Sequence, residues 1–394
     1  MKKIMLLIMF LLFPLNVFSL DIELDSKSAI VVNRENNDIL YEKNSKEKLT
    51  IASLTKIMTT IVALENIKDL DELVTINYED INISYDYVVV GLKEGMEISY
   101  NDLLYSTIMY SAADSATALA NHVLGSYDEF INKMNELARK INMSNSHFSN
   151  PVGYDEDNYS TSYDLYLLLD YALDNKNFYD IYTTKKYYIE KLDKTLGNGV
   201  IASIEKNKLN NKNIIFNGTK TGFTTKSGLC FSGITKLDNN EIIFITLGAD
   251  GDFEDAKNII DNINLANSFK ELYSNRIILK KDKLIDNIIY KKGNKEYNYE
   301  IKSIKDISYY MDNTLNLQYL KVYYDGIISV DNTYKENDKL GILKVYYEDK
   351  LLYSEDVLFD KDNIVIEEYE KNYKNLIIFI VICIFGLFIF KKKK

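Results

Sequence analysis

A lysine within an apolar helix is the feature that most constrains this chain of 394 residues. From Leu54 to Leu64 the apolar side chains recur at helical spacing, which predicts a buried helix. Ser53 stands at its start and Lys56 follows three residues later, so the two side chains share a face and can hydrogen-bond. Burial lowers the pKa of a lysine, and the N–H groups of a helix N-terminus favour a developing oxyanion. The stretch therefore predicts a nucleophile, a base and an oxyanion site within one helical turn.

A simpler interpretation is that Ser53 only caps the helix and Lys56 lies at the surface. Ser-x-x-Lys alone does not exclude it, because short motifs also match by chance. Two further clusters argue for a site. Ser111 stands at the junction of two predicted helices, where a hydroxyl can project into a cleft. The run 220–222, Lys-Thr-Gly, opens a predicted strand, and its glycine admits a ligand close to an edge strand, so a carboxylate-bearing substrate could pair along it.

The order of the predicted elements indicates an α+β fold. Strands at both ends with helices between them indicate one domain whose sheet is completed by distant segments. After residue 275, short β-rich runs alternate with Gly, Asn and Asp, which predicts a small all-β domain. The predicted strands of the first domain are 29–32, 39–41, 214–216, 229–234 and 242–247, and its predicted helices are 54–64, 101–111, 114–123, those starting at 126 and 161, and 253–273.

Both ends of the chain carry apolar segments. Residues 1–19 have the pattern of a secretory signal, with cleavage expected after Ser19 and an uncleaved anchor as the alternative. Residues 376–390 are apolar and precede four lysines, which favours a transmembrane helix with the lysines inside over a buried core helix. The predicted layout is a signal peptide at 1–19, a catalytic domain at 20–275, an all-β domain at 276–367, a stalk at 368–375, a membrane anchor at 376–390 and a cytoplasmic tail at 391–394.

Charge and cysteine content exclude several classes of protein. The net charge of −11 becomes −17 without the six lysines in the two terminal segments, and such an acidic surface argues against nucleic-acid binding. The two cysteines are Cys230 and Cys383, and the second lies in the apolar C-terminal run. Neither a disulfide framework nor a cysteine metal site is therefore expected.

The three clusters occur in the order Ser-x-x-Lys, Ser-x-x, Lys-Thr-Gly, and the sequence closely resembles the low-molecular-mass penicillin-binding proteins, which are serine-type D-alanyl-D-alanine carboxypeptidases. The resemblance runs from Ser28 to about Tyr273, and residues 339–347 resemble the β-rich C-terminal domain that precedes a membrane anchor in that family. It implies a penicillin-binding/serine β-lactamase-like domain, in which an antiparallel sheet packs against a helical cluster. The segments that carry the resemblance are 52–59, 103–105, 147–153 and 218–224.

By this resemblance, three residues carry the reaction. Ser53 attacks the carbonyl between two terminal D-alanines and forms an acyl-enzyme, Lys56 is the general base, and Ser111 passes a proton to the leaving amine. β-Lactams are expected to acylate Ser53 because they mimic the dipeptide. No cofactor and no metal is implied.

The three residues of the third cluster and the following Phe223 are expected to bind the substrate, a peptidoglycan stem peptide that ends in D-Ala-D-Ala. Lys220 supplies positive potential, and Thr221 binds the carboxylate of the leaving D-alanine. Gly222 belongs to the same strand, and the N–H of Phe223 completes the oxyanion hole with that of Ser53. The expected location is the outer face of the bacterial cytoplasmic membrane.

The chain departs from the family pattern at two points. Ala113 stands where the second motif usually has Asn, so the chain is either an enzyme with a substitute contact or a catalytically weakened penicillin-binding scaffold. Only Arg34, Arg139 and Arg276 are present, and none lies near 249–252, where the family often has a carboxylate-binding arginine.

Two other enzyme classes fit less well. A metal-dependent carboxypeptidase needs clustered ligands, whereas His122 and His147 are the only histidines and are predicted on different elements. His147 is expected to be a structural loop residue. A class A β-lactamase has neither a second β domain nor an anchor, and it would turn penicillin over rapidly.

Overall fold

The structure is a computed structural model that describes residues 22–84, 87–154, 156–206 and 214–368. The chain divides into two compact units, the first ending at Glu271 and the second beginning at Leu272. The predicted signal peptide at 1–19 and the predicted anchor at 376–390 both lie outside the described residues. Within the described ranges, no helix combines the length and the apolar character that crossing a membrane requires.

A five-stranded antiparallel sheet forms the frame of the first unit, in the order β2-β1-β11-β10-β9. The N-terminal hairpin joins the C-terminal strands through the pairing of β1 with β11, so distant segments complete the sheet as the sequence predicted. This order leaves β9 at one edge. The strands are β1 (Ser28–Asn33), β2 (Asp38–Lys43), β9 (Gly218–Thr224), β10 (Gly228–Leu237) and β11 (Asn240–Ala249).

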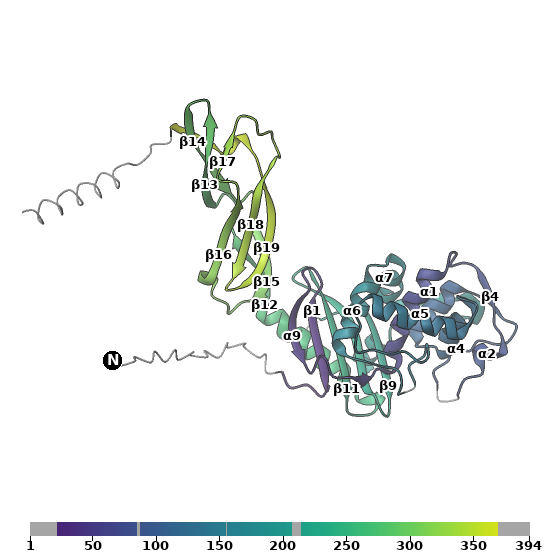
Figure 1. Ribbon diagram of the computed structural model, residues 1–394. Helices are drawn as coiled ribbons and strands as arrows, with labels where there is room; N and C mark the ends of the chain where they lie inside the picture. The colour runs from purple at the N-terminus through teal and green to yellow at the C-terminus, as the bar shows by residue number, and fades with distance from the viewer. Residues whose placement is uncertain (1–21, 85–86, 155, 207–213, 369–394) are drawn as a thin grey trace, which may run out of the picture. The chain divides into compact units, whose positions relative to one another are not determined.

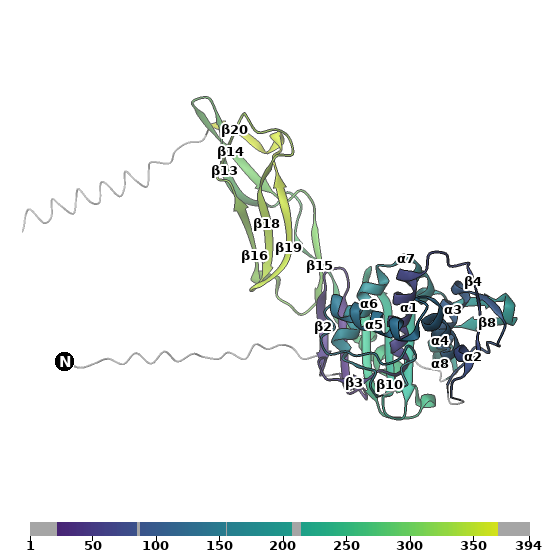
Figure 2. The ribbon, with the colours of Figure 1, turned by 45° about the vertical axis from the view of Figure 1, so that its right-hand side comes forward.

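Successive side chains of a strand point to opposite faces of the sheet. Helices cover both of these faces. Ile243 and Ile245 of β11 belong to the core shared with the helical cluster. On the other face Thr246 accepts a hydrogen bond from Asn262 of α9 (Lys257–Leu272) at 2.7 Å. Figures 1 and 2 show this α+β arrangement, with α9 and α6 on opposite sides of the β1–β11 pair in Figure 1. The other helices are α1 (Thr55–Asn66), α2 (Tyr78–Ile81), α3 (Tyr100–Tyr105), α4 (Ala113–His122), α5 (Tyr127–Lys140), α6 (Ser162–Leu173), α7 (Lys176–Thr183) and α8 (Gly199–Lys206).

Two helix predictions need correction. The helix predicted at 101–111, with Asn101 expected as its cap, begins at Tyr100 and is capped by Ser99, whose Oγ accepts a hydrogen bond from the N–H of Asp102 at 3.1 Å. The helix predicted at 253–273 is interrupted, because Ala256 has a left-handed φ of 53° between a short 3₁₀ turn and α9. A helix cannot continue through a left-handed residue, so α9 begins only at residue 257.

The strand predicted at 214–216 is also wrong. Its side chains alternate as in a strand, with Ile214 and Phe216 buried and Ile215 exposed. This alternation comes from packing on the sheet, since Phe216 packs edge-on against Phe231. The segment itself is not assigned as a strand, and the edge strand β9 begins only at Gly218.

The second unit is built almost wholly from strands, and its described residues after Leu272, the last residue of α9, contain no α-helix. Its strands form three sheets, β12-β15, β17-β13-β14-β20 and β16-β18-β19, around two small apolar clusters. The strands are β12 (Tyr273–Leu279), β13 (Leu284–Lys292), β14 (Lys295–Lys302), β15 (Ile307–Asp312), β16 (Leu320–Gly326), β17 (Ser329–Asp331), β18 (Lys339–Tyr347), β19 (Lys350–Leu358) and β20 (Ile364–Glu368).

We predict that the hydrogen bonds of Asp261 in α9 to the N-terminal segment stabilise the fold. Its buried carboxylate accepts hydrogen bonds from the N–H groups of Asp25 at 3.1 Å and Ser26 at 2.8 Å. Asp261→Ala leaves these donors without a partner, so the free energy of unfolding should fall by about 2 kcal/mol in urea titrations of the full chain. Asp250→Ala, which removes an exposed ion-pair partner, is the control and should have no measurable effect. Equal losses in both variants would contradict the prediction.

Candidate active site

The first site element is the short 3₁₀ turn η1 (Ala52–Leu54) that leads into α1. It places Ser53 and Lys56 on one face, with the lysine Nζ 3.1 Å from the serine Oγ. The Lys56 side chain is only 1% exposed, and its Nζ also donates to the backbone carbonyl of Val152 at 2.8 Å. The amine is thus buried between a hydroxyl and a carbonyl, and no carboxylate of the described residues hydrogen-bonds to it.

A tight loop after α5 supplies that carbonyl and contacts the turn that carries Ser53. A Cβ atom on Gly153, which has a φ of 88°, would lie 1.9 Å from the carbonyl oxygen of Ala52, so only glycine allows this approach. Asn150 fixes the loop by accepting hydrogen bonds from the N–H groups of Val152 at 3.0 Å and Gly153 at 2.7 Å. Sequence reasoning assigned no role to these residues, although the Asn-Pro-Val-Gly run is a recognisable turn signal.

The second element is the junction that carries Ser111. A π-helical turn over Ser106–Tyr110 follows α3, and Ser111 itself is left-handed with a φ of 61°. This geometry turns its hydroxyl toward the sheet edge, where it accepts a hydrogen bond from the Nζ of Lys220 at 3.0 Å. Single π-turns within α-helices are frequent at functional sites.

The third element is the edge strand β9. Lys220 is 3% exposed, and its Nζ donates to the Ser111 hydroxyl and to the carbonyl of Thr221 at 2.6 Å. A Cβ atom on Gly222 would lie 2.9 Å from the backbone nitrogen of Ser53. The strand therefore passes directly beside Ser53, and a glycine there keeps the approach open.

The two lysines have lowered pKa values. Burial lowers the pKa of Lys56 well below its usual range, and the positive charge of Lys220 lowers it further, whereas Asp114 opposes the shift. Burial lowers the pKa of Lys220 to about 7. A lysine whose pKa has fallen this way holds a neutral amine near physiological pH, and such an amine can accept a proton from a serine hydroxyl.

The structure brings the predicted residues together. Ser53, Ser111 and the β9 residues 220–223 line one cavity of about 520 Å³, and Lys56 lies behind Ser53. The N–H of Ser53 lies in the first turn of its helix, where backbone donors have no intrahelical partner. Among the described lining residues of this cavity there is no arginine.

Ala113 begins α4 and is buried. Its N–H donates to the carbonyl of Val88 at 2.8 Å, and its side chain joins a small apolar cluster with Ala116 and Val152. The next residue, Asp114, accepts hydrogen bonds from the three consecutive N–H groups of residues 90–92. These bonds hold the loop that contains residues 88–92 beside the cavity, which Val88 lines. Asp114 and this loop are site elements that sequence reasoning missed.

The histidines have structural contacts in the described chain. His122 hydrogen-bonds to Asp80 at 2.8 Å, and the N–H of His147 donates to the carbonyl of Tyr159 at 2.9 Å. Within the described ranges, no group of three or more His, Cys, Asp or Glu side chains is placed to hold a metal ion.

Several solved structures have the same fold as this chain. Penicillin binding protein 5 from Haemophilus influenzae is similar with a TM-score of 0.65 and 21% identity, over 89% of this chain and 99% of that one. A peptidoglycan synthesis regulatory factor (PBP3) from Streptococcus pneumoniae gives a TM-score of 0.66 at 18% identity, over 86% and 99% of the two chains. At these identities the likeness establishes the fold.

Sequence comparison establishes the family. The D-alanyl-D-alanine carboxypeptidase family, Peptidase_S11, matches residues 16–251. The chain is 28% identical over 280 residues to D-alanyl-D-alanine carboxypeptidase DacF of Bacillus subtilis, covering 69% of each chain. It is 30% identical over 238 residues to the DacC carboxypeptidase of Escherichia coli, covering 58% of each. The chain therefore belongs to the family of serine-type D-alanyl-D-alanine carboxypeptidases, which confirms the resemblance found in its sequence.

Proposed function

We propose that this chain removes the terminal D-alanine from peptidoglycan stem peptides through an acyl-enzyme on Ser53. One observation carries the proposal: the Ser53 Oγ lies 3.1 Å from the amine of a buried lysine whose pKa is lowered, beside an edge strand that can receive a peptide. This combination provides an activated nucleophile and a place for its substrate.

In the acylation step, the neutral amine of Lys56 takes the proton of the Ser53 hydroxyl while the serine oxygen attacks the carbonyl carbon of the penultimate residue. The N–H groups of Ser53 and Phe223 stabilise the oxyanion. The carbon–nitrogen bond then breaks, and the leaving amine receives a proton from the Lys56 ammonium by way of the Ser111 hydroxyl. Water afterwards hydrolyses the ester and restores Ser53.

The leaving D-alanine carries a carboxylate, and two groups of β9 are available to bind it. Lys220 supplies a buried positive charge below its pKa of about 7, and Thr221 supplies a hydroxyl in the same cavity. We assign carboxylate binding to these two residues, and Gly222 leaves room for the substrate backbone. β-Lactams present a similar carboxylate and a reactive carbonyl, so they should acylate Ser53.

The competing proposal is a penicillin-binding scaffold without turnover, because Ala113 replaces the usual Asn. The Val152 carbonyl, which accepts a hydrogen bond from Lys56 at 2.8 Å, favours the enzyme. A backbone acceptor positions the lysine amine without the missing amide. The side chain of Ala113 cannot make the hydrogen bond that Asn would make to the substrate. We therefore expect a reduced rate.

We also propose the layout of the whole protein. It would be exported by a signal peptide at 1–19 and held on the outer face of the cytoplasmic membrane by an anchor at 376–390, with a stalk at 368–375 and the tail 391–394 inside. The catalytic domain would comprise 20–275 and the all-β domain 276–367. The apolar run and its four terminal lysines support the anchor.

The first test is release of D-alanine from a peptide that ends in D-Ala-D-Ala. We expect the wild type to release it and to be labelled by a fluorescent penicillin, whereas Ser53→Ala should do neither. Ser268→Ala, which removes a partly exposed hydroxyl that bonds only within α9, is the control and should behave as the wild type. Labelling without release above the Ser53→Ala background would favour the scaffold over the enzyme.

The second prediction concerns pH. Lys56 must be neutral to act as a base, so kcat/KM should rise as pH increases through its lowered pKa. Lys220 must be charged to attract the carboxylate, so kcat/KM should fall above a pH of about 7. In Lys220→Arg the guanidinium stays charged, and the alkaline fall should disappear even if the maximum is lower. A variant that keeps the wild-type alkaline fall would show that another group causes it.

A third prediction tests the approach of β9 to the nucleophile. The methyl group of Gly222→Ala would lie 2.9 Å from the Ser53 nitrogen and 3.0 Å from the Ala52 Cβ. It should obstruct the oxyanion donors and slow acylation by penicillin about 100-fold, comparable to the loss of one such donor. Circular dichroism and the melting temperature should show that the variant is folded. Acylation at the wild-type rate would show that the reacting carbonyl does not bind between the N–H groups of Ser53 and Phe223.

A further inference from the structure

Ser111 lines the active-site cavity from a strained stretch of backbone. The π-helical turn Ser106–Tyr110 precedes it, and Ser111 itself has a left-handed φ of 61°, which is costly for a residue with a Cβ atom. Strained residues persist only where the surrounding structure holds them. The hydrogen bond from Lys220 holds the Ser111 hydroxyl, but it does not fix the turn in front of it.

A hairpin of the strands β7 (Lys186–Ile189) and β8 (Lys194–Gly197) contacts the residue in front of this turn. Tyr187 of β7 stacks on the ring of Tyr105, and the two ring centroids are 3.8 Å apart. The Tyr187 hydroxyl also donates a hydrogen bond to the carboxylate of Asp102 in α3 at 2.7 Å. The hairpin is therefore fixed to the helix that leads into the turn, and Figure 2 shows β8 near α3.

Lys194, the first residue of β8, contacts the other end of the turn. Its Nζ lies 3.9 Å from the ring centroid of Tyr110, which directly precedes Ser111. The same Nζ donates a hydrogen bond to the carbonyl of Val90 at 3.2 Å. An ammonium group over the face of a tyrosine ring is attracted by the π electrons of the ring. One side chain thus joins the last residue of the turn to the loop 87–92.

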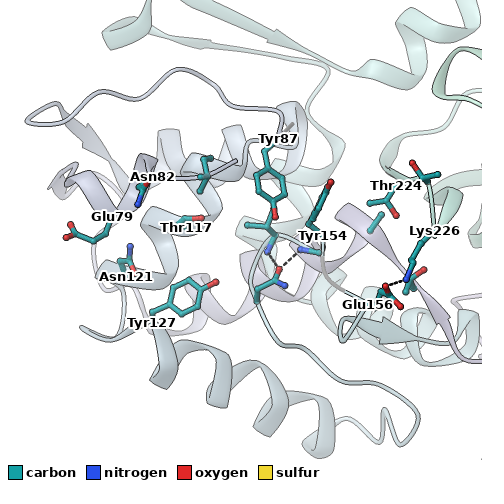
Figure 3. A pocket seen from close by; sticks show the side chains of 17 residues that line it. Glu79, Asn82, Tyr87, Thr117, Asn121, Tyr127, Tyr154, Glu156, Thr224 and Lys226 are labelled. Carbon is teal, nitrogen blue, oxygen red and sulfur yellow. Dashed lines mark hydrogen bonds and ion pairs between the residues drawn. The ribbon is translucent and has the colours of Figure 1, made fainter. Parts of the chain in front are cut away.

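The loop 87–92 is a firm support for this contact, because it is also held from two other directions. Asp114 of α4 accepts hydrogen bonds from the N–H groups of residues 90–92. At the start of the loop, Tyr87 packs edge-on against Tyr154, with ring centroids 4.6 Å apart (Figure 3). The loop is therefore anchored independently of the hairpin, and the carbonyl that Lys194 contacts has a fixed position.

We propose that Lys194 is a positioning residue that places the Ser111 hydroxyl for transfer of a proton to the leaving nitrogen. The proposal rests on the proposed function, which routes this proton through Ser111. Lys194 acts through Tyr110 and is not among the residues that line the active-site cavity. Without its ammonium group the end of the turn is released, and the strained backbone of Ser111 can relax away from its position. Ser53 and Lys56 lie on another element, so the attack on the carbonyl should be unaffected.

Two matched substrates separate this role from a general disturbance of the site. In the first, a peptide that ends in D-Ala-D-Ala, the leaving nitrogen must gain a proton as its bond to carbon breaks. In the second, sulfur replaces that nitrogen, and a thiolate leaves without a proton because a thiol is a far stronger acid than the N–H group of an amine. Both substrates acylate Ser53, and they release D-alanine and 2-mercaptopropanoate respectively. Only the first should depend on the position of Ser111.

In Lys194→Met the side chain keeps its apolar stem and loses its ammonium group. We expect kcat/KM of the full chain for release of D-alanine to fall about tenfold, which is part of the roughly 100-fold or more that a positioned proton donor contributes. For the thioester, kcat/KM should stay within about twofold of the wild type. Lys194→Arg should restore most of the rate with the peptide, because a guanidinium can stack on Tyr110 and donate to the Val90 carbonyl. Lys191→Met, which removes an exposed lysine from the turn of the same hairpin, is the control and should match the wild type with both substrates.

An equal loss with both substrates in Lys194→Met would overturn the proposal, because it would show a general disturbance of the site. Wild-type rates with both substrates would overturn it as well. Acylation by penicillin also requires a proton on the leaving nitrogen, so it should slow by a similar factor in this variant. A wild type that releases neither product would reject the proposed function and this inference with it. The two failures are distinguishable, because the wild type is active in the first and inactive in the second.

Discussion

The structure of the site depends on keeping the amine of Lys56 away from water. A charged ammonium in this position would lose its hydration, so burial favours the neutral form that can act as a base. The amine still needs hydrogen-bond partners, and the Val152 carbonyl and the Ser53 hydroxyl provide them. That carbonyl reaches the amine because Gly153 permits the loop to touch the turn that carries the nucleophile. The left-handed φ of 45° at Ala52 shows that this turn tolerates strain of order 1 kcal/mol beside the nucleophile.

The hydrogen bond from Lys56 to the Val152 carbonyl explains how a site with Ala113 can remain organised. In place of a polar side chain, the structure has an apolar cluster of Ala113, Ala116 and Val152 next to the lysine. Val152 of this cluster also supplies the carbonyl that accepts the hydrogen bond of the Lys56 amine. Asp114 opposes the lowering of the Lys56 pKa and also ties down the loop beside the cavity. Backbone groups and packing therefore fix the orientation of the Lys56 amine, which we propose to be the base, while alanine cannot supply the contact to the substrate amide.

Local sequence patterns predicted the parts of the site that lie within one element. The spacing of Ser53 and Lys56 fixes their shared helix face, and the break between two predicted helices located Ser111. Contacts between distant segments could not be predicted in the same way. Gly153 is important because its loop comes very close to Ala52, which lies about 100 residues earlier in the chain. No local sequence pattern predicts that distance. The wrong strand at 214–216 has a similar cause, since its alternation reflects the packing of Phe216 against Phe231 in a segment that is not assigned as a strand. The family resemblance supplied the relation between elements that periodicity lacks.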